Sequence, residues 1–201
     1  MNAIARMPKT AKERGKIAPK KLAHIVLRTQ EGNVENLASW YAKVLEGDFM
    51  MKSPFISFVT YDDEHHRVAV LALPGVKPHE DMLCGLHHVA FTYDNLHDLM
   101  HTYNRLKDEH GIAPQFCINH GPTTSMYYFD PDKNQIELQV DNVPEDKFAE
   151  YFANGEFTDN PIGVKFDPDE MTAKLAAGVP EAELLKRPAG APPDLAEFPV
   201  N

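Results

Sequence analysis

Two stretches decide the fold: LAHIVL at residues 22–27 and LHHVAF at residues 86–91, which repeat one pattern 64 residues apart. A helical pattern follows each stretch and ends at a glycine, Gly47 in the first copy and Gly111 in the second. Three runs typical of β-strands come next in each copy, at 48–52, 55–61 and 66–73 and at 113–118, 124–130 and 134–140. The sequence therefore predicts the order β-α-β-β-β twice. Because one such unit leaves an apolar sheet face uncovered, we expect an α+β fold in which two paired βαβββ modules form a cupped mixed sheet.

Apolar residues at helical spacing support both helices. The first stripe consists of Leu37, Trp40, Tyr41, Val44 and Leu45, and the second of Leu96, Leu99, Tyr103 and Leu106. Asp94 is the predicted N-cap of the second helix, and Gly111 is predicted to end it in the left-handed conformation. Turn formers join the last two strands of each copy, at 62–64 and at 130–134.

Three parts make up the predicted domain organisation. Residues 1–20 form a basic N-terminal arm, which we interpret as solvated rather than as an organelle-targeting segment. Residues 21–142 form the catalytic domain, with modules at 21–76 and 84–142. Residues 143–201 form a C-terminal extension with a helix opened by Pro144 and a second helix capped by Asp167, which starts at Pro168 and stops at Gly178. The last fourteen residues hold four prolines, so we expect either an extended arm that wraps a neighbouring subunit or closes the cup, or a partly ordered tail.

Composition excludes several classes of partner. The chain of 201 residues carries a formal charge of −10, which gives no general attraction to nucleic acid or anionic lipid. No stretch approaches the roughly 20 apolar residues that a membrane-spanning helix needs. The only two cysteines, Cys84 and Cys117, lack zinc-site spacing, and we expect free thiols that are at least partly buried, which fits a reducing cytoplasm.

His24, His88 and Glu137 are the candidate metal ligands. The two histidines occupy matching positions in the repeat, so the same strand phase places both on the concave face. Glu137 lies between Ile136 and Leu138, where a buried carboxylate needs a partner. A single strand histidine is more often a core residue and a strand glutamate more often faces solvent, but the matched pair with a carboxylate favours a metal. Two imidazoles and one carboxylate are the ligand set of non-haem Fe(II) oxygenases. His87 would point to the opposite face from His88.

The segments LAHIVL, EHHRVAV, GLHHVAF and YYFDPDKNQIELQ resemble the type I extradiol dioxygenases of the vicinal oxygen chelate superfamily, over residues 22–142. This resemblance implies paired βαβββ modules and an Fe(II), or in some members Mn(II), held by His24, His88 and Glu137. It places Tyr127 beside a bound catechol and gives His66 the handling of protons and oxygen intermediates, with His65 as a turn or outer-face residue. His120 matches a further active-site histidine on the loop before the tyrosine.

The resemblance leads to a predicted function: Fe(II)-dependent cleavage of a catecholic ring with O2. Related glyoxalases and epimerases use a fourth protein ligand in the last strand of the first module, and residues 68–73, VAVLAL, contain no such donor. Two alternatives stay open, a metal-dependent isomerase or lyase and a non-catalytic protein that binds aromatic ligands. Because the chain has one pair of modules where many relatives have two, we expect a homodimer or larger homo-oligomer.

Overall fold

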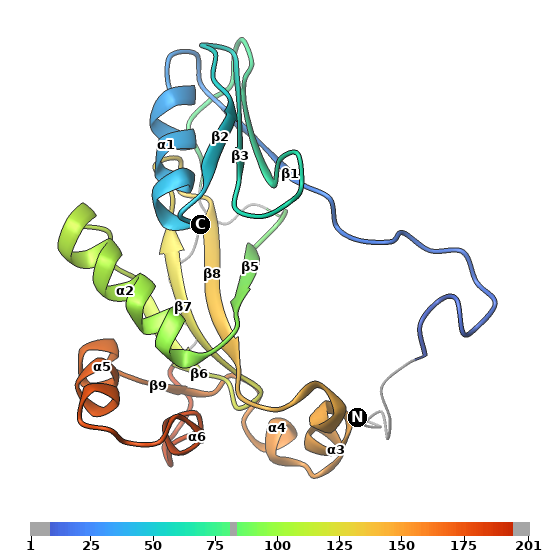
Figure 1. Ribbon diagram of the computed structural model, residues 1–201, viewed down its shortest axis with the longest axis vertical. Coiled ribbons are helices and arrows are strands. Elements are labelled where there is room, and N and C mark those ends of the chain that lie inside the picture. Colours follow the sequence, from blue (N-terminus) through green and yellow to red (C-terminus); the bar gives the residue numbers. More distant parts are fainter. Residues whose placement is uncertain (1–8, 81–83, 195–201) are drawn as a thin grey trace. The chain divides into compact units, whose positions relative to one another are not determined.

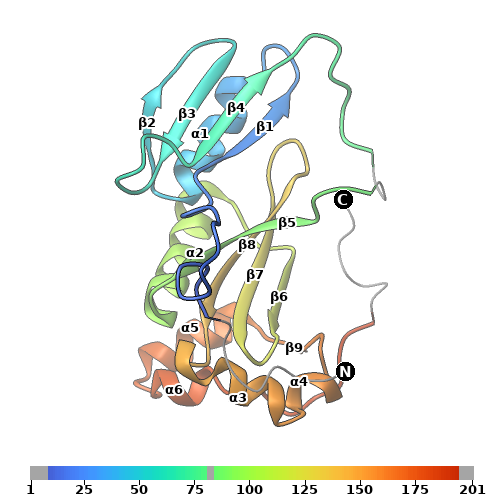
Figure 2. The same ribbon diagram turned by 90° about the vertical axis from the view of Figure 1, so that its right-hand side faces the viewer.

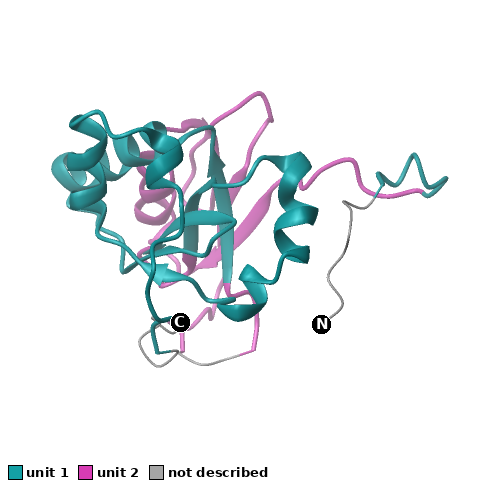
Figure 3. Ribbon diagram, turned by 90° about the horizontal axis from the view of Figure 1, so that it is seen from below, with its two compact units in different colours: residues 1–16, 88–128, 136–200 teal, residues 17–87, 129–135, 201 magenta. Residues whose placement is uncertain are grey.

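The computed structural model describes residues 9–80 and 84–194, and the chain divides into two compact units (Figure 3). Within the described residues, unit 1 comprises 9–16, 88–128 and 136–194, and unit 2 comprises 17–80, 84–87 and 129–135. Each unit has its own sheet (Figure 1).

Unit 2 contains the first βαβββ module. Its elements are β1 (Ile25–Thr29), α1 (Val34–Val44), β2 (Asp48–Met51), β3 (Ile56–Thr60) and β4 (Val68–Ala72). The four strands are ordered β1-β4-β3-β2, with β1 and β4 parallel and the other neighbours antiparallel. The α1 stripe is in the core, where Leu37, Tyr41 and Val44 are fully buried. The predicted element order of the first module is confirmed.

The end of α1 differs from the prediction. The helix is capped by Leu45, and Glu46 adopts the positive φ, at 47°, that ends it. Gly47 serves a different purpose, because a Cβ at this position would approach the Thr60 carbonyl oxygen to 2.6 Å. The glycine therefore allows the chain to pass close to β3 instead of providing the left-handed stop.

The second module supplies the five-stranded sheet (Figure 2). Its elements are β5 (His88–Tyr93), α2 (Leu96–His110), β6 (Phe116–Asn119), β7 (Thr123–Phe129) and β8 (Gln135–Asp141). The strand order is β5-β8-β7-β6-β9, where β9 (Val164–Lys165) comes from the C-terminal extension. The second βαβββ order is thereby confirmed, with an added edge strand that the sequence did not reveal.

The caps of α2 confirm one prediction and correct another. Gly111 adopts φ 65° and ends the helix as expected. The N-cap is Asn95 and not Asp94: the Asn95 side-chain oxygen accepts a hydrogen bond from the Asp98 backbone N–H at 2.8 Å. Asparagine and aspartate are equally good caps, so the choice between neighbouring residues depends on where the strand before them ends.

The C-terminal extension packs on the second module. It contains the 3₁₀ helix η1 (Glu145–Lys147) and the helices α3 (Phe148–Ala153), α4 (Glu156–Asp159), α5 (Pro168–Ala176) and α6 (Glu181–Leu184). Asp167 caps α5 as predicted, accepting from the Asp169 and Glu170 N–H groups, and Gly178 follows the helix with φ 82°. The Asp169 carboxylate accepts from the Tyr103 hydroxyl of α2 at 2.8 Å, so the extension supports the helix of its own chain.

The remaining sequence expectations concern the termini, the thiols and membrane segments. Residues 188–194 form no helix or strand, as their prolines predict, whereas 1–8 and 195–201 lie outside the described residues. Cys117 is buried, but Cys84 is exposed, so the prediction of two at least partly buried thiols is wrong for Cys84. No helix in the described part of the chain is long and apolar enough to cross a membrane.

The turn between β7 and β8 is fixed by one buried carboxylate. Asp130 is 4% exposed and accepts hydrogen bonds from the Asn134 backbone N–H at 2.8 Å and the Asn134 side chain at 2.8 Å. The Tyr41 hydroxyl of α1 donates to the same carboxylate at 3.0 Å. All three residues belong to unit 2, so this turn is part of the packing of the first module.

Replacing Asp130 with alanine should lower the free energy of unfolding by about 1–3 kcal/mol, because the buried Tyr41 hydroxyl and the Asn134 donors would lose their acceptor. Urea unfolding measures this change. The matched control is Asp63→Ala in the corresponding turn of the first module, where the exposed side chain predicts a change within about 0.5 kcal/mol. Equal losses in the two variants would contradict the assigned role of Asp130.

Candidate active site

Glu137 lies in the middle of β8, on the face of the strand opposite that of Ile136 and Leu138. Its strand neighbours Ile136 and Leu138 are almost fully buried on the other face, as the alternation of a strand requires. The Glu137 side chain is only 7% exposed. The carboxylate is therefore buried in the sheet, and the side chains that contact it can be identified.

His88, the first residue of β5, provides one partner. Its Nε2 atom lies 3.0 Å from Glu137 Oε2, and its side chain is 31% exposed. Burial alone would raise the pKa of Glu137, but the hydrogen bonds from His88 and Ser125 outweigh burial and lower the pKa below its usual value. Glu137 is thus held in the charged form on this face.

The separation of these two groups suits one metal ion. Neighbouring nitrogen and oxygen ligands with bonds of about 2.1 Å at a right angle lie roughly 3 Å apart, and the observed separation is 3.0 Å. The lowered pKa of Glu137 also keeps its carboxylate in the ionised form that a cation requires. The donor chemistry of unit 1 therefore fits a bound divalent cation.

Tyr127 and His120 form a second pair beside Glu137. The Tyr127 hydroxyl lies 2.9 Å from His120 Nε2, and His120 Nδ1 lies 2.6 Å from the carbonyl oxygen of Ile162. A carbonyl can only accept, so Nδ1 carries the hydrogen. In the neutral ring Nε2 then has the lone pair, and the Tyr127 hydroxyl, which is also within hydrogen-bonding range of the Glu137 carboxylate, can donate to it.

Burial determines the protonation of this pair. Burial lowers the pKa of His120, which favours the neutral ring. Burial and the adjacent Glu137 charge raise the pKa of Tyr127 well above its usual value, so the phenol keeps its proton. The Tyr127 ring also stands edge-on to His88, with ring centroids 5.4 Å apart. Unit 1 thus brings four of the predicted residues together.

His24 and His66 lie together in unit 2. His24 is exposed directly before β1, and its ring centroid is 4.3 Å from that of His66. The His66 ring stacks on Phe58, with centroids 4.4 Å apart and an interplanar angle of 15°. Burial and the neighbouring His24 and His65 lower the pKa of His66. His65 lies in the predicted turn with its Nδ1 2.5 Å from His66 Nδ1.

The predicted ligands are divided between the units, His88 and Glu137 in unit 1 and His24 in unit 2. Among the residues that the structure describes, no group of three His, Cys, Asp or Glu side chains is gathered closely enough to hold a metal. The complete ligand set therefore stays a prediction, whereas the pairs His88–Glu137 and Tyr127–His120 are observed contacts.

The sequence missed three contributors to these clusters. Ser125 hydrogen-bonds to Glu137, and its position two residues before Tyr127 in β7 could have placed it on the same face. Phe58 supports His66 from β3 and could be found by the same alternation. The Ile162 carbonyl has no side-chain signature, so no sequence pattern could identify it.

The paired βαβββ order and the histidine and carboxylate side chains described above agree with a match to a known protein family. A family model described as Glyoxalase/Bleomycin resistance protein/Dioxygenase superfamily matches residues 21–138, and the chain belongs to this superfamily. A crystal structure of a glyoxylase/bleomycin resistance protein/dioxygenase domain from Frankia sp. EAN1pec shares the fold with a TM-score of 0.50 and 16% identity, covering 62% of this chain and 99% of that one.

Two curated relatives narrow the class of enzyme within this superfamily. The chain is 43% identical to biphenyl-2,3-diol 1,2-dioxygenase 2 of Rhodococcus globerulus, over 81% of this chain and 85% of that protein. It is 41% identical to biphenyl-2,3-diol 1,2-dioxygenase 3 of the same organism, over 83% of this chain and 88% of that protein. The predicted resemblance to ring-cleaving extradiol dioxygenases is confirmed.

The tautomer of His120 is directly measurable. In ¹⁵N-labelled protein prepared without iron, the His120 ring should show a protonated Nδ1 and an unprotonated Nε2, because its Nδ1 faces the Ile162 carbonyl. Loss of these signals in His120→Gln assigns them. A ring protonated only at Nε2 would contradict the hydrogen-bond pattern.

Proposed function

We propose that this protein is a non-haem Fe(II)-dependent extradiol dioxygenase that cleaves a catecholic ring with O2. The observation that carries the proposal is the buried, charged Glu137 paired with His88 on the face that also holds Tyr127 and His120. The similarity to two biphenyl-2,3-diol dioxygenases supports a catechol with an aryl substituent as substrate.

The proposed metal ligands are His24, His88 and Glu137, with Fe(II) as the cofactor and Mn(II) as the alternative that accepts the same ligands. When bound, the metal supplies coordination sites that hold catechol and O2 together and a route for electrons between them. Support comes from the 3.0 Å separation of the His88 and Glu137 donor atoms and from the exposure of His24. Strand β4 contains no donor side chain that could act as a fourth ligand.

Tyr127 and His120 would remove a proton from the substrate. The Tyr127 oxygen can accept a hydrogen bond from a catechol hydroxyl while its own hydrogen is donated to His120 Nε2. The lone pair on Nε2 can then take up the proton through Tyr127, and the Ile162 carbonyl stabilises the resulting imidazolium at Nδ1. The two side chains thus form a path that leads a proton away from the substrate oxygen.

His66 would act on the oxygen atoms that derive from O2. Its ring is held by stacking on Phe58 and by contact with His24, so a ring nitrogen can be directed at one position. A histidine at such a position can stabilise a developing anionic oxygen by hydrogen bonding and return a proton to it.

Activity of iron-loaded protein tests the function. Purified under anaerobic conditions and then mixed with air and catechol, 3-methylcatechol or 2,3-dihydroxybiphenyl, the protein should consume O2 and form a yellow ring-opened product. Bound zinc or nickel without O2 uptake would instead support the isomerase or lyase alternative. Binding of the aromatic compounds without metal would support the non-catalytic alternative.

Single replacement of His24, His88 or Glu137 by alanine should abolish iron retention, because each change removes one of three ligands. Iron per chain after gel filtration, measured by a colorimetric chelator, checks this outcome. His87→Ala is the matched control, since this exposed residue is adjacent to His88 but is not a proposed ligand. Stoichiometric iron and full activity in any ligand variant would remove that residue from the set.

His66→Phe should keep iron and catechol binding but lower turnover by about 10²–10⁴-fold, as expected when a general acid–base group is lost. The aromatic replacement preserves stacking on Phe58. His97→Phe on the exposed surface of α2 is the control. Unchanged turnover in His66→Phe would reject its role in proton transfer.

The homo-oligomeric state and the cytoplasmic location stay proposals. The exposed apolar side chains of Phe55 and Leu86, 69% and 75% accessible, support self-association. Light scattering of the purified protein measures its oligomeric state.

A further inference from the structure

A segment of the C-terminal extension, residues 160–163, lies against His120. In the antiparallel pairing of β6 with β9, Asn119 lies opposite Val164. Residues 160–163, which precede β9, therefore lie at the end of β6. The contact is close: a Cβ on Gly163 would come within 2.7 Å of the His120 Cα atom, and Gly163 has φ 105°. Only glycine fits this position without strain. The extension therefore packs directly on the backbone of His120.

Asn160 fixes the direction of the carbonyl that His120 uses. The Asn160 side-chain oxygen accepts from the Gly163 backbone N–H at 2.8 Å and from the Ile162 N–H at 3.2 Å. The Gly163 N–H and the Ile162 carbonyl belong to one planar trans peptide and point in opposite directions. By binding this N–H, Asn160 directs the carbonyl to the other side, where it accepts from His120 Nδ1.

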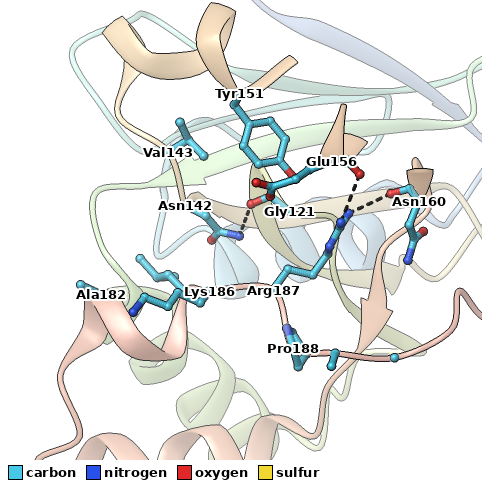
Figure 4. A pocket seen from close by; sticks show the side chains of 13 residues that line it. Gly121, Asn142, Val143, Tyr151, Glu156, Asn160, Ala182, Lys186, Arg187 and Pro188 are labelled. Carbon is cyan, nitrogen blue, oxygen red and sulfur yellow. Dashed lines mark hydrogen bonds between the residues drawn. The ribbon is translucent and has the colours of Figure 1, made fainter. Parts of the chain in front are cut away.

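Arg187 in turn holds the backbone around Asn160. Its guanidinium donates to the Asn160 carbonyl at 2.9 Å and to the Glu156 carbonyl at 3.1 Å, both drawn as dashed lines in Figure 4. Charged donors in a planar group make strong, directional hydrogen bonds. Arg187 therefore joins the end of α6 to the segment that precedes Ile162.

The two neighbours of His120 in the chain, Asn119 and Gly121, are also held by hydrogen bonds. The Asn142 side chain donates to the Gly121 carbonyl at 2.9 Å (Figure 4). The Gly121 N–H is bound by the Asn119 side-chain oxygen at 2.9 Å, and the Asn119 amide donates to the Leu185 carbonyl at 3.0 Å. Residues on both sides of His120 are therefore fixed, and the orientation of the imidazole is set by the Ile162 carbonyl at Nδ1 together with the Tyr127 hydroxyl at Nε2.

We infer that Asn160 and Arg187 are positioning residues for catalysis: through the Ile162 carbonyl they set the orientation and the tautomer of His120, so that Nε2 faces Tyr127. This inference rests on the proposed function. Neither residue contacts the candidate substrate position. Because acid–base catalysis depends on the placement of the proton acceptor, their loss should reduce turnover far more than substrate binding.

A double-mutant cycle on the iron-loaded full-length enzyme tests this inference. Asn160→Ala should lower kcat per bound iron about tenfold with KM changed less than about twofold. In the His120→Ala background the same change should lower kcat less than about twofold, because the group it positions is absent. Asn160→Asp, which keeps the acceptor for both N–H groups, should restore kcat to within about threefold of the unsubstituted enzyme.

Asn95→Ala is the matched control, because this asparagine also accepts from a backbone N–H, that of Asp98 at 2.8 Å, but at the start of α2 and outside the contacts through Glu156, Asn160 and Ile162. Arg187→Met, with Lys186→Met as its neighbour control, provides a second cycle should Asn160→Ala not fold. Inactivity of the unsubstituted iron-loaded enzyme would reject the proposed function. In an active enzyme, equal losses of kcat with and without His120 would overturn the positioning role alone.

Discussion

The carboxylate of Glu137 is a buried charge, and the sheet of unit 1 is arranged to satisfy it. Such a group is tolerated only when hydrogen bonds or opposite charges replace the water it has lost. The hydrogen-bond partners of Glu137 come from the strands on either side of β8: His88 from β5, and Ser125 and Tyr127 from β7. A shift of either strand by one residue would turn its donor to the other face. The requirement of one carboxylate therefore constrains how β5, β7 and β8 align beside one another.

The C-terminal extension contributes to this site from outside the repeated modules. It adds β9 to the edge of the sheet, places Asp169 against α2 and delivers the Ile162 carbonyl to His120. These contacts lie within unit 1, so the extension belongs to the second module rather than forming a separate body. Within the described residues this addition is made to the second module, which also holds the Tyr127–His120 pair.

The repeat carried most of the information that the sequence contained about the fold. Periodicity of two and of 3.6 residues predicted both βαβββ units, because those patterns reflect which face is buried. The failures have local causes. Asp94 and Asn95 are both good caps, and Gly47 was interpreted as a helix stop although its role is close contact with Thr60. From the cost of a buried carboxylate the sequence predicted only that Glu137 needs a partner, and its direct contact with His88 is a finding of the structure.

The contacts that escaped prediction are those made by backbone atoms of distant segments. Every residue has a backbone carbonyl, so the residue type at position 162 gives no indication of the contact with His120. The short strand β9 has two residues and lacks a detectable alternation. For His24 the sequence gives the strongest argument available, its match to His88 in the repeat, and its place in a three-ligand set stays a prediction.

The Asp130 turn has a consequence for how this protein can be divided. Although residues 129–135 follow the second module's helix in the sequence, they complete the packing of the first. The Tyr41 hydroxyl donates a hydrogen bond to Asp130, and the Asn33 side chain donates another to Asp132 at 2.8 Å. A polypeptide truncated after His87 would leave the Tyr41 hydroxyl buried without its acceptor. The internal symmetry of the sequence thus does not make its halves autonomous, and a split-protein version would need to carry this hairpin tip with the first half.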